Sequence, residues 1–280
     1  MSRTLGVSAG IAAGICLATG GLALRLIEAA EGWQILVYRG AALAISIFVW
    51  MLFAYKRDTM KAFARLGWRG LFAAGVIGVV AVLYVFAILN TTVANTVVIL
   101  TLSPLITAAV AWLFLKEPVS RSTLVTMLIA LVGVAVMFAD GLSGEGVFGM
   151  VIALGAASCF SLFVVTLRAG REVDMVPAIG LSGVVTVLIS LPFAPDLNLS
   201  TWDIGIGVFL GVVQLAVGYA CIAIATRHLT ASLVALLLLS EVVFAPLFVW
   251  VGIGEAPTLL AGLGGIVVVA AVAFQAVRNA

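Results

Sequence analysis

One carboxylate, Glu241, lies deep inside an uninterrupted apolar run of the sequence. If that run crosses a membrane as a helix, Glu241 stands about 18 Å from one end and so near the middle. A charged side chain at that depth costs at least about 2.5–3.5 kcal/mol on insertion scales, so such residues usually serve a function. Glu241 is therefore a candidate for proton coupling or for binding a substrate ammonium group. The alternative is a protonated, structural glutamic acid that bonds Ser240 or a neighbouring backbone carbonyl.

Two arginines, Arg25 and Arg39, lie inside apolar runs, within about two helical turns of one predicted membrane face. The planar guanidinium of Arg39 suits a substrate carboxylate, which it can bind through two parallel hydrogen bonds. The competing interpretation is an arginine that extends to the membrane interface or pairs with Glu28 or Glu31.

Polar and aromatic side chains inside other apolar runs are candidate walls of a cavity. Asn95 and Ser103 belong to a polar stripe at helical spacing that also includes Thr92. An amide such as Gln214 needs a partner in lipid, and so does a buried tyrosine hydroxyl. Small and hydroxyl residues more often serve close helix packing, which is the competing interpretation for most of them. The predicted substrate-binding residues are Arg39, Tyr84, Asn95, Ser103, Ser158, Gln214, Tyr219 and Phe244, with Glu241 as the proton-coupling candidate.

Several kinds of chemistry have no residues to perform them. The single histidine, His228, falls in a predicted loop, which argues against haem ligation and histidine metal sites. The sequence contains no G-x-x-x-x-G-K-[ST] phosphate loop, so ATP hydrolysis is not expected, and nothing implies an ATPase partner. We therefore expect no enzyme, no metal and no cofactor.

The composition excludes whole classes of protein. Of the 280 residues, 64% are hydrophobic and only 9% are charged, whereas soluble chains average about 25% charged. So few charged side chains cannot cover a soluble core, and the same scarcity excludes a disordered chain and a nucleic-acid binder. Because the apolar runs are continuous rather than alternating, a transmembrane barrel is disfavoured. The remaining class is an all-α polytopic membrane protein whose surface meets the lipid bilayer.

Spans of about 20 apolar residues, separated by short polar breaks, divide the chain into ten predicted transmembrane helices. The loops are too short to hold a soluble domain. The predicted spans are residues 6–27, 33–55, 70–89, 93–115, 122–139, 147–167, 176–193, 204–225, 229–253 and 258–276.

Charge alternates between the two sides of the predicted bundle. Apart from Arg25 and Arg39, every lysine and arginine falls at the termini or in loops on one side, while the opposite loops carry acidic residues. The positive-inside rule then places both termini and the basic loops in the cytoplasm.

The chain also repeats itself once. At an offset of about 138 residues, Trp112 pairs with Trp250, Glu117 with Glu255, and Ser103 with Glu241. The predicted repeats are residues 1–140 and 141–280, each with five helices. Because five is odd, the second repeat enters the membrane inverted, and inverted repeats are typical of transporters whose substrate path lies between the halves.

At this point the sequence resembles a known family. Each half contains a helix that ends in a W-x-x-x-x-E pattern followed by proline, at Glu117-Pro118 and at Glu255-Ala-Pro257. These motifs, with Arg39, resemble the EamA-type branch of the drug/metabolite transporter superfamily, and within it the pattern looks most like the YddG-type aromatic amino acid exporters. One departure is that Glu241 is followed by valine rather than proline, so Pro104 and Pro246 predict kinks that are not symmetric.

The resemblance implies a multi-pass exporter in the bacterial inner membrane, with spans 1–4 and 6–9 around a central cavity and spans 5 and 10 behind it. We expect a secondary transporter of small metabolites, most of all amino acids including aromatic ones, that works by alternating access. One alternative is an exporter of other amphipathic metabolites or drugs. Another is a structural or channel-like subunit that transports nothing, against which the inverted repeat argues.

Overall fold

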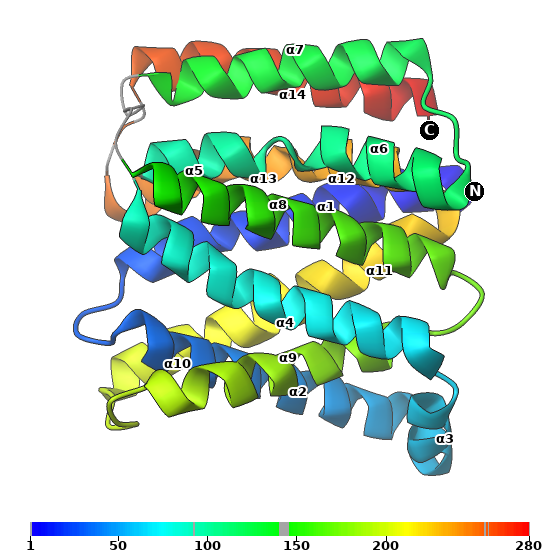
Figure 1. Ribbon diagram of the computed structural model, residues 1–280. Coiled ribbons are helices and arrows are strands. Elements are labelled where there is room, and N and C mark those ends of the chain that lie inside the picture. The colour runs from blue at the N-terminus through cyan, green and yellow to red at the C-terminus, as the bar shows by residue number, and fades with distance from the viewer. Residues whose placement is uncertain (1, 92, 140–145, 255, 257, 280) are drawn as a thin grey trace.

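The computed structural model describes the whole chain except residues 1, 92, 140–145, 255, 257 and 280, and the regular elements of this part are helices joined by short loops. Figure 1 labels the α-helices. They are α1 (Ser2–Arg25), α2 (Gly32–Tyr55), α3 (Thr59–Ala64), α4 (Gly67–Asn90), α5 (Val93–Leu100), α6 (Ser103–Leu115), α7 (Arg121–Met137), α8 (Val147–Ala169), α9 (Val176–Ser190), α10 (Thr201–Phe209), α11 (Gly218–His228), α12 (Ala231–Leu238), α13 (Ser240–Ile253) and α14 (Leu259–Asn279). A π-helix over Leu210–Val217 joins α10 to α11.

The predicted spans correspond to these helices, some of them joined end to end. Within the described residues, 9 helical segments are long and apolar enough to cross a membrane. The remaining predicted span, the fifth at residues 122–139, is the shorter apolar helix α7 of 17 residues. At 1.5 Å per residue α7 is about 26 Å long, slightly less than the ~30 Å hydrocarbon core of a bilayer. A span this short is accommodated when the bilayer thins around it or when flanking side chains reach to the membrane interface.

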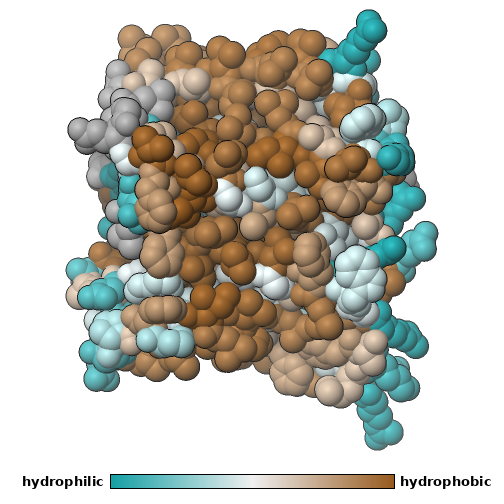
Figure 2. Space-filling view, in the orientation of Figure 1, coloured by the Kyte–Doolittle hydropathy of each residue, from teal (hydrophilic) through white to brown (hydrophobic). Residues whose placement is uncertain are grey.

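The bundle has two chemically different ends. Figure 1 shows both chain termini at one end, and it shows α1 and α8, the first helices of the two halves, running in opposite directions. We call the end with the termini the basic end, since the loops there carry most of the lysines and arginines, and the other the acidic end. Figure 2 shows mostly apolar side chains between these ends and hydrophilic side chains at them, as expected for a protein that spans a bilayer.

The fourth span of each half is broken at equivalent positions. In the first half α5 and α6 meet at Thr101–Leu102, and in the second half α12 and α13 meet at Leu239, which is Thr101 shifted by the repeat offset. Short i→i+3 hydrogen bonds tighten the chain at Leu102 and Leu239. Pro104 lies in the first turn of α6, directly after the first break, whereas Pro246 lies inside α13, so the two prolines do not occupy equivalent places.

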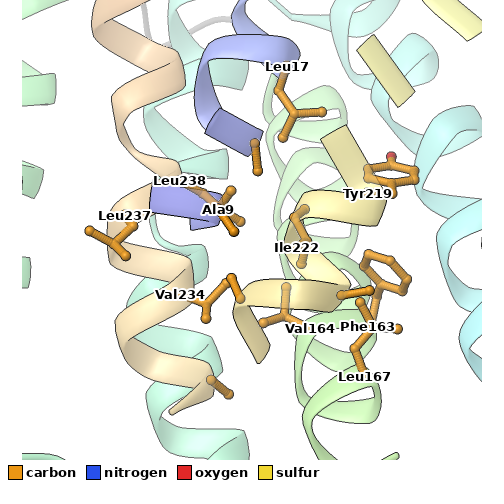
Figure 3. Close-up of a cluster of buried hydrophobic side chains, with 14 of the residues drawn as sticks. Ala9, Leu17, Phe163, Val164, Leu167, Tyr219, Ile222, Val234, Leu237 and Leu238 are labelled. Carbon is orange, nitrogen blue, oxygen red and sulfur yellow. The ribbon is translucent and has the colours of Figure 1, made fainter. Parts of the chain in front are cut away.

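The core joins the first helix to helices of the second half. Figure 3 shows side chains from α1, α8, α11 and α12 meeting in one cluster, with the ring of Tyr219 next to that of Phe163. Gly10 lets α1 approach this cluster closely, because a Cβ there would lie 2.9 Å from the side chain of Leu237. Lipid tails are as apolar as leucine, so close packing rather than water exclusion holds these helices together.

Helices α7 and α14 form a separate pair at the edge of the bundle, packed mainly against each other (Figure 1). Their backbones touch where Gly264 meets Gly133. Nearer the basic end a polar cluster joins them, in which Gln275 donates to Thr123 across 2.8 Å and lies close to Thr126. Spans 5 and 10 thus lie apart from the others, as the family resemblance implies.

Gly264→Ala should destabilise the pair of α7 and α14. The added Cβ would overlap the carbonyl oxygen of Gly133, and overpacking of this kind costs about 1–3 kcal/mol. We expect a lower midpoint of thermal unfolding for the detergent-solubilised protein. Gly262→Ala is the matched control, because a Cβ at Gly262 meets nothing within 4 Å. Equal midpoints for the two variants would contradict this account of the contact.

Candidate functional site

A cavity of about 180 Å³ lies between α1, α2 and α4 and reaches the loop that joins α1 to α2 at the acidic end. Its walls are mostly apolar, with two polar residues, Arg39 and Tyr84, on them. The lining residues are Leu24, Ile27, Ala30, Gly32, Ile35, Leu36, Arg39, Tyr84 and Val85.

Arg39 is buried on α2 with only 8% of its surface exposed. Its Nε atom has no hydrogen-bond partner, and among the described residues no salt bridge joins it to Glu28 or Glu31. The pairing with those loop acids, one of the two interpretations of the sequence, is therefore not what the structure records. A buried cation with an unused donor is an arrangement that an anionic ligand group could complete.

Four predicted site residues from four helices interact electrostatically. Arg39 on α2 and Glu241 on α13 attract each other, and each of these charges acts on the phenols of Tyr84 on α4 and Tyr219 on α11. Glu241 stands in the first turn of α13, directly after the break at Leu239. Both halves thus contribute to this group, in which Arg39 and Tyr219 are buried and Tyr84 and Glu241 are partly exposed.

The hydrogen bonds around Glu241 test whether it is a structural glutamic acid bonded to Ser240 or to a nearby backbone carbonyl. The hydroxyl of Ser240 donates to the carbonyl of Leu237 at 2.8 Å, one turn back on its own chain segment. No hydrogen bond of the described residues ends on the Glu241 carboxylate. Its structural role as a partner of Ser240 is therefore not observed, and its carboxylate stays available to a proton or a ligand.

Gln214 lies in the π-helix, which packs against α2 at the level of Arg39. Its Nε2 atom donates to the carbonyl oxygen of Leu17 at 3.1 Å, while its Oε1 atom is buried without a partner. Gly211 allows the close approach, because a Cβ there would lie 2.5 Å from the Arg39 carbonyl oxygen. π-Helices occur frequently at functional sites, and no pattern in the sequence indicates this one.

The other predicted site residues make local contacts. Asn95 donates to Thr91 at 3.0 Å, and Ser158 donates to Leu154 within its own helix at 2.8 Å, which fits the packing interpretation. The carbonyl oxygen of Ser103 accepts a hydrogen bond from Ser161. Phe244 stacks on Phe248, with ring centroids 6.1 Å apart. The structure does not place these four residues in the charged cluster, and Thr92 lies outside the described residues.

At the basic end an ion pair that sequence analysis did not single out links several segments. Arg168 at the end of α8 binds Glu117, in the loop between α6 and α7, at 2.7 Å. Arg168 also donates to the carbonyl of Thr226 on α11, and Glu117 accepts from the backbone of Ala231 at the start of α12. The pair thus links four segments, and both side chains are largely buried. In the repeat Glu117 matches Glu255, which lies outside the described residues.

At the acidic end one carboxylate fixes the loop beside the cavity. Asp203, which is fully buried, accepts backbone hydrogen bonds from Glu28, Ala29 and Ala30 at 2.9 to 3.2 Å. The indole of Trp202 donates to Leu26 in the same loop. These bonds join the loop between α1 and α2 to the start of α10. Sequence analysis missed this contact too, because the partners are more than 170 residues apart.

Comparison with known proteins agrees with this architecture. The EamA-like transporter family matches residues 4–139 and again residues 147–276. The chain belongs to the EamA-like transporter family. It is thus a multi-pass membrane protein of a transporter family rather than an enzyme. The two matches also account for the repeated pattern of breaks, whereas the boundary predicted at 140 and 141 lies outside the described residues and stays a prediction.

Two individual proteins are similar to this EamA-like chain. The "Uncharacterized transporter YdfC" of Bacillus subtilis (strain 168) is 30% identical over 183 residues, which cover 63% of this chain and 60% of that protein. A solved structure titled "Crystal structure of protein" superposes with a TM-score of 0.84, covering 98% of this chain and 97% of that one. At 17% identity it shows a shared fold only.

A thiol reagent that cannot cross membranes should reach the cavity from the acidic end alone. In a variant without Cys16, Cys159 and Cys221, we expect Tyr84→Cys to be labelled from the acidic side, because the cavity reaches that end. Thr226→Cys, next to the ion pair at the basic end, should resist labelling from either side. Labelling is followed by mass shift in vesicles of both orientations.

Two exposed positions report which side the reagent reaches. Asn198→Cys marks the acidic side and Met60→Cys the basic side, since both residues are exposed in this structure. Labelling of Tyr84→Cys only under conditions that label Met60→Cys would contradict the assignment of the open side.

Proposed function

We propose that this protein is a secondary transporter that exports amino acids, including aromatic ones, across the bacterial inner membrane by alternating access. The observation that carries the proposal is the cavity lined by the buried Arg39 and by Tyr84, which interact electrostatically with Glu241 and Tyr219 from the other half. A zwitterionic amino acid needs a cation for its carboxylate and an anion for its ammonium group. Arg39 supplies the first and Glu241 the second.

Aromatic side chains near this cluster support cargo with an apolar body. The ring centroid of Phe163 lies 5.4 Å from that of Tyr219 and 6.1 Å from that of Phe160. Rings in such arrangements gain about 0.5–1.5 kcal/mol beyond their buried area, and a substrate ring can join the series. This is the basis for including phenylalanine and its relatives, and it agrees with the resemblance to YddG-type exporters.

Glu241 also offers a route for proton coupling. A carboxylate that binds either a proton or the substrate ammonium group cannot bind both at once, so proton and substrate exchange for each other at one site. Such mutually exclusive binding is the basis of antiport. A site that offers one arginine and one acid is less suited to doubly anionic cargo, which would require more cationic residues.

Alternating access follows from two inverted halves around one site. The cavity reaches the acidic end, and the pair of Arg168 and Glu117 links four segments at the basic end, which supports a proposed conformation that is open at the acidic end and closed at the basic end. The positive-inside rule favours a cytoplasmic basic end with both termini there, so we propose that this conformation faces outward. The matching breaks at Leu102 and Leu239 are the proposed points of bending, and the junction at residues 140–141 the proposed boundary of the halves.

Phenylalanine counterflow in proteoliposomes tests the proposed cargo. We expect counterflow above that of empty liposomes, and a loss of about tenfold or more in Arg39→Gln, because a hydrogen bond to a charged group contributes about 1.5–3 kcal/mol. The control is Arg171→Gln, which removes an exposed arginine from a loop. Absence of counterflow with every amino acid tried would withdraw the amino acid assignment, and absence with a broad metabolite set would favour a subunit that transports nothing.

Glu241→Gln should remove the effect of an imposed pH gradient. The amide resembles the protonated acid and releases no proton, so accumulation driven by the gradient should disappear while weaker counterflow at equal pH persists. Glu172→Gln, at an exposed loop position, is the matched control. An unchanged response to the gradient in Glu241→Gln would refute the coupling role and leave Glu241 as a residue that binds substrate.

Weakening the ion pair should open the basic end. In Glu117→Gln we expect thiol labelling of Thr226→Cys from the basic side to rise about tenfold, which corresponds to about 1.4 kcal/mol of lost closure. Asp58→Asn is the control, because its pair with Lys61 at the same end is about two thirds exposed and exposed pairs contribute little. Equal labelling of Thr226→Cys alone, with Glu117→Gln and with Asp58→Asn would show that the pair does not hold this end closed.

A further inference from the structure

A second cavity lies outside the proposed transport site, on the surface that faces lipid. It is a groove of about 400 Å³ between α6, the connection that follows it, and α7. Every residue on its walls is apolar. They are Leu105, Ala108, Ala109, Trp112, Pro118, Val119 and Leu124. The groove thus lies on the side of α7 that faces α6, and Figure 1 shows α7 beside α14 at the edge of the bundle.

Basic residues flank the connection that lines one end of the groove. Pro118 and Val119 belong to the connection at the basic end, so the groove extends from the apolar belt to the level where lipid head groups lie. Lys116 and Arg121 flank this connection and are exposed. No salt bridge joins either of them to an acid among the described residues, and the nearby Glu117 is already bound to Arg168.

A third basic residue stands beside this end of the groove. Arg278, in the last turn of α14, donates to the hydroxyl of Ser122 in the first turn of α7. Trp112 lines the groove with 63% of its surface exposed, and tryptophan is enriched at the level of the head groups. An apolar groove with basic residues near one end complements the two parts of an anionic lipid, its acyl chains and its charged head group.

We propose that this groove binds an anionic glycerophospholipid. One acyl chain lies along Leu105, Ala109 and Leu124, and the phosphate is held by Lys116 and Arg121. Basic pockets between transmembrane helices bind anionic head groups in this manner. The acyl chain fills space that side chains leave empty, and the lipid connects α7 to α6 across the groove. Bound lipid should therefore stabilise the attachment of the edge pair.

The experiment is a thermal unfolding titration of the detergent-solubilised protein with phosphatidylglycerol, compared with phosphatidylcholine of the same chains. We expect phosphatidylglycerol to raise the unfolding midpoint at concentrations about tenfold below those at which phosphatidylcholine acts. The double variant Lys116→Ala/Arg121→Ala should lose this preference. Arg57→Ala/Arg65→Ala is the matched control, since it removes two exposed charges near α3, at the same end but away from the groove.

Two further measurements distinguish a lipid seated in the groove from a free anion bound to the cations alone. Ala109→Trp fills the groove from an exposed position of α6 without touching a charge, so it should weaken the effect of phosphatidylglycerol while leaving the folded protein intact. Glycerol phosphate, which has the head-group charge but no chains, should not compete. Equal effects of both lipids, an equal loss in the Arg57/Arg65 control, or competition by glycerol phosphate would each overturn the proposal.

Discussion

The absence of water from the bilayer core requires that buried polar groups find partners within the protein, and this constraint explains most of the polar contacts of the structure. Asp203 satisfies three backbone N–H groups of one loop, and Arg168 satisfies an acid and a carbonyl at the other end. Against this background the exceptions carry information. Among the described residues four buried side-chain atoms keep no hydrogen-bond partner, on Arg39, Thr107, Ser190 and Gln214. Two of these residues, Arg39 and Gln214, lie on neighbouring segments beside the proposed site.

The two halves reach the same architecture with little sequence in common. What they share is a break in the fourth span, at Leu102 and at Leu239, where hydrogen bonds of the i→i+3 kind replace the regular ladder. A broken helix offers backbone groups and a change of direction at mid-membrane, and transporters place binding sites at such breaks. Glu241 lies within one turn of the second break, whereas its counterpart Ser103 carries no charge, so the site itself is not symmetric.

The sequence predicts the spans well because each requires a long apolar run, and it predicts Arg39 and Glu241 because charges in such runs are rare. The family match confirms the class of protein, and the residue-level roles stay predictions. Other features could not be predicted. Asp203 and the loop it binds are more than 170 residues apart, and the pair of Arg168 and Glu117 spans 51 residues, so no local pattern encodes them. The π-helix around Gln214 is likewise set by packing against α2 rather than by residue type.

The π-helix has a consequence for how the site could be reshaped. It spans Leu210–Val217 and ends immediately before α11, whose second residue is Tyr219. If the π-helix converted to α-helical hydrogen bonding, it would lose its extra residue per turn. The residues of α11 would then shift by one position along the helix. In an α-helix one position is a rotation of about 100° and a rise of 1.5 Å. Such a step would turn the phenol of Tyr219 away from the ring of Phe163, which it now contacts.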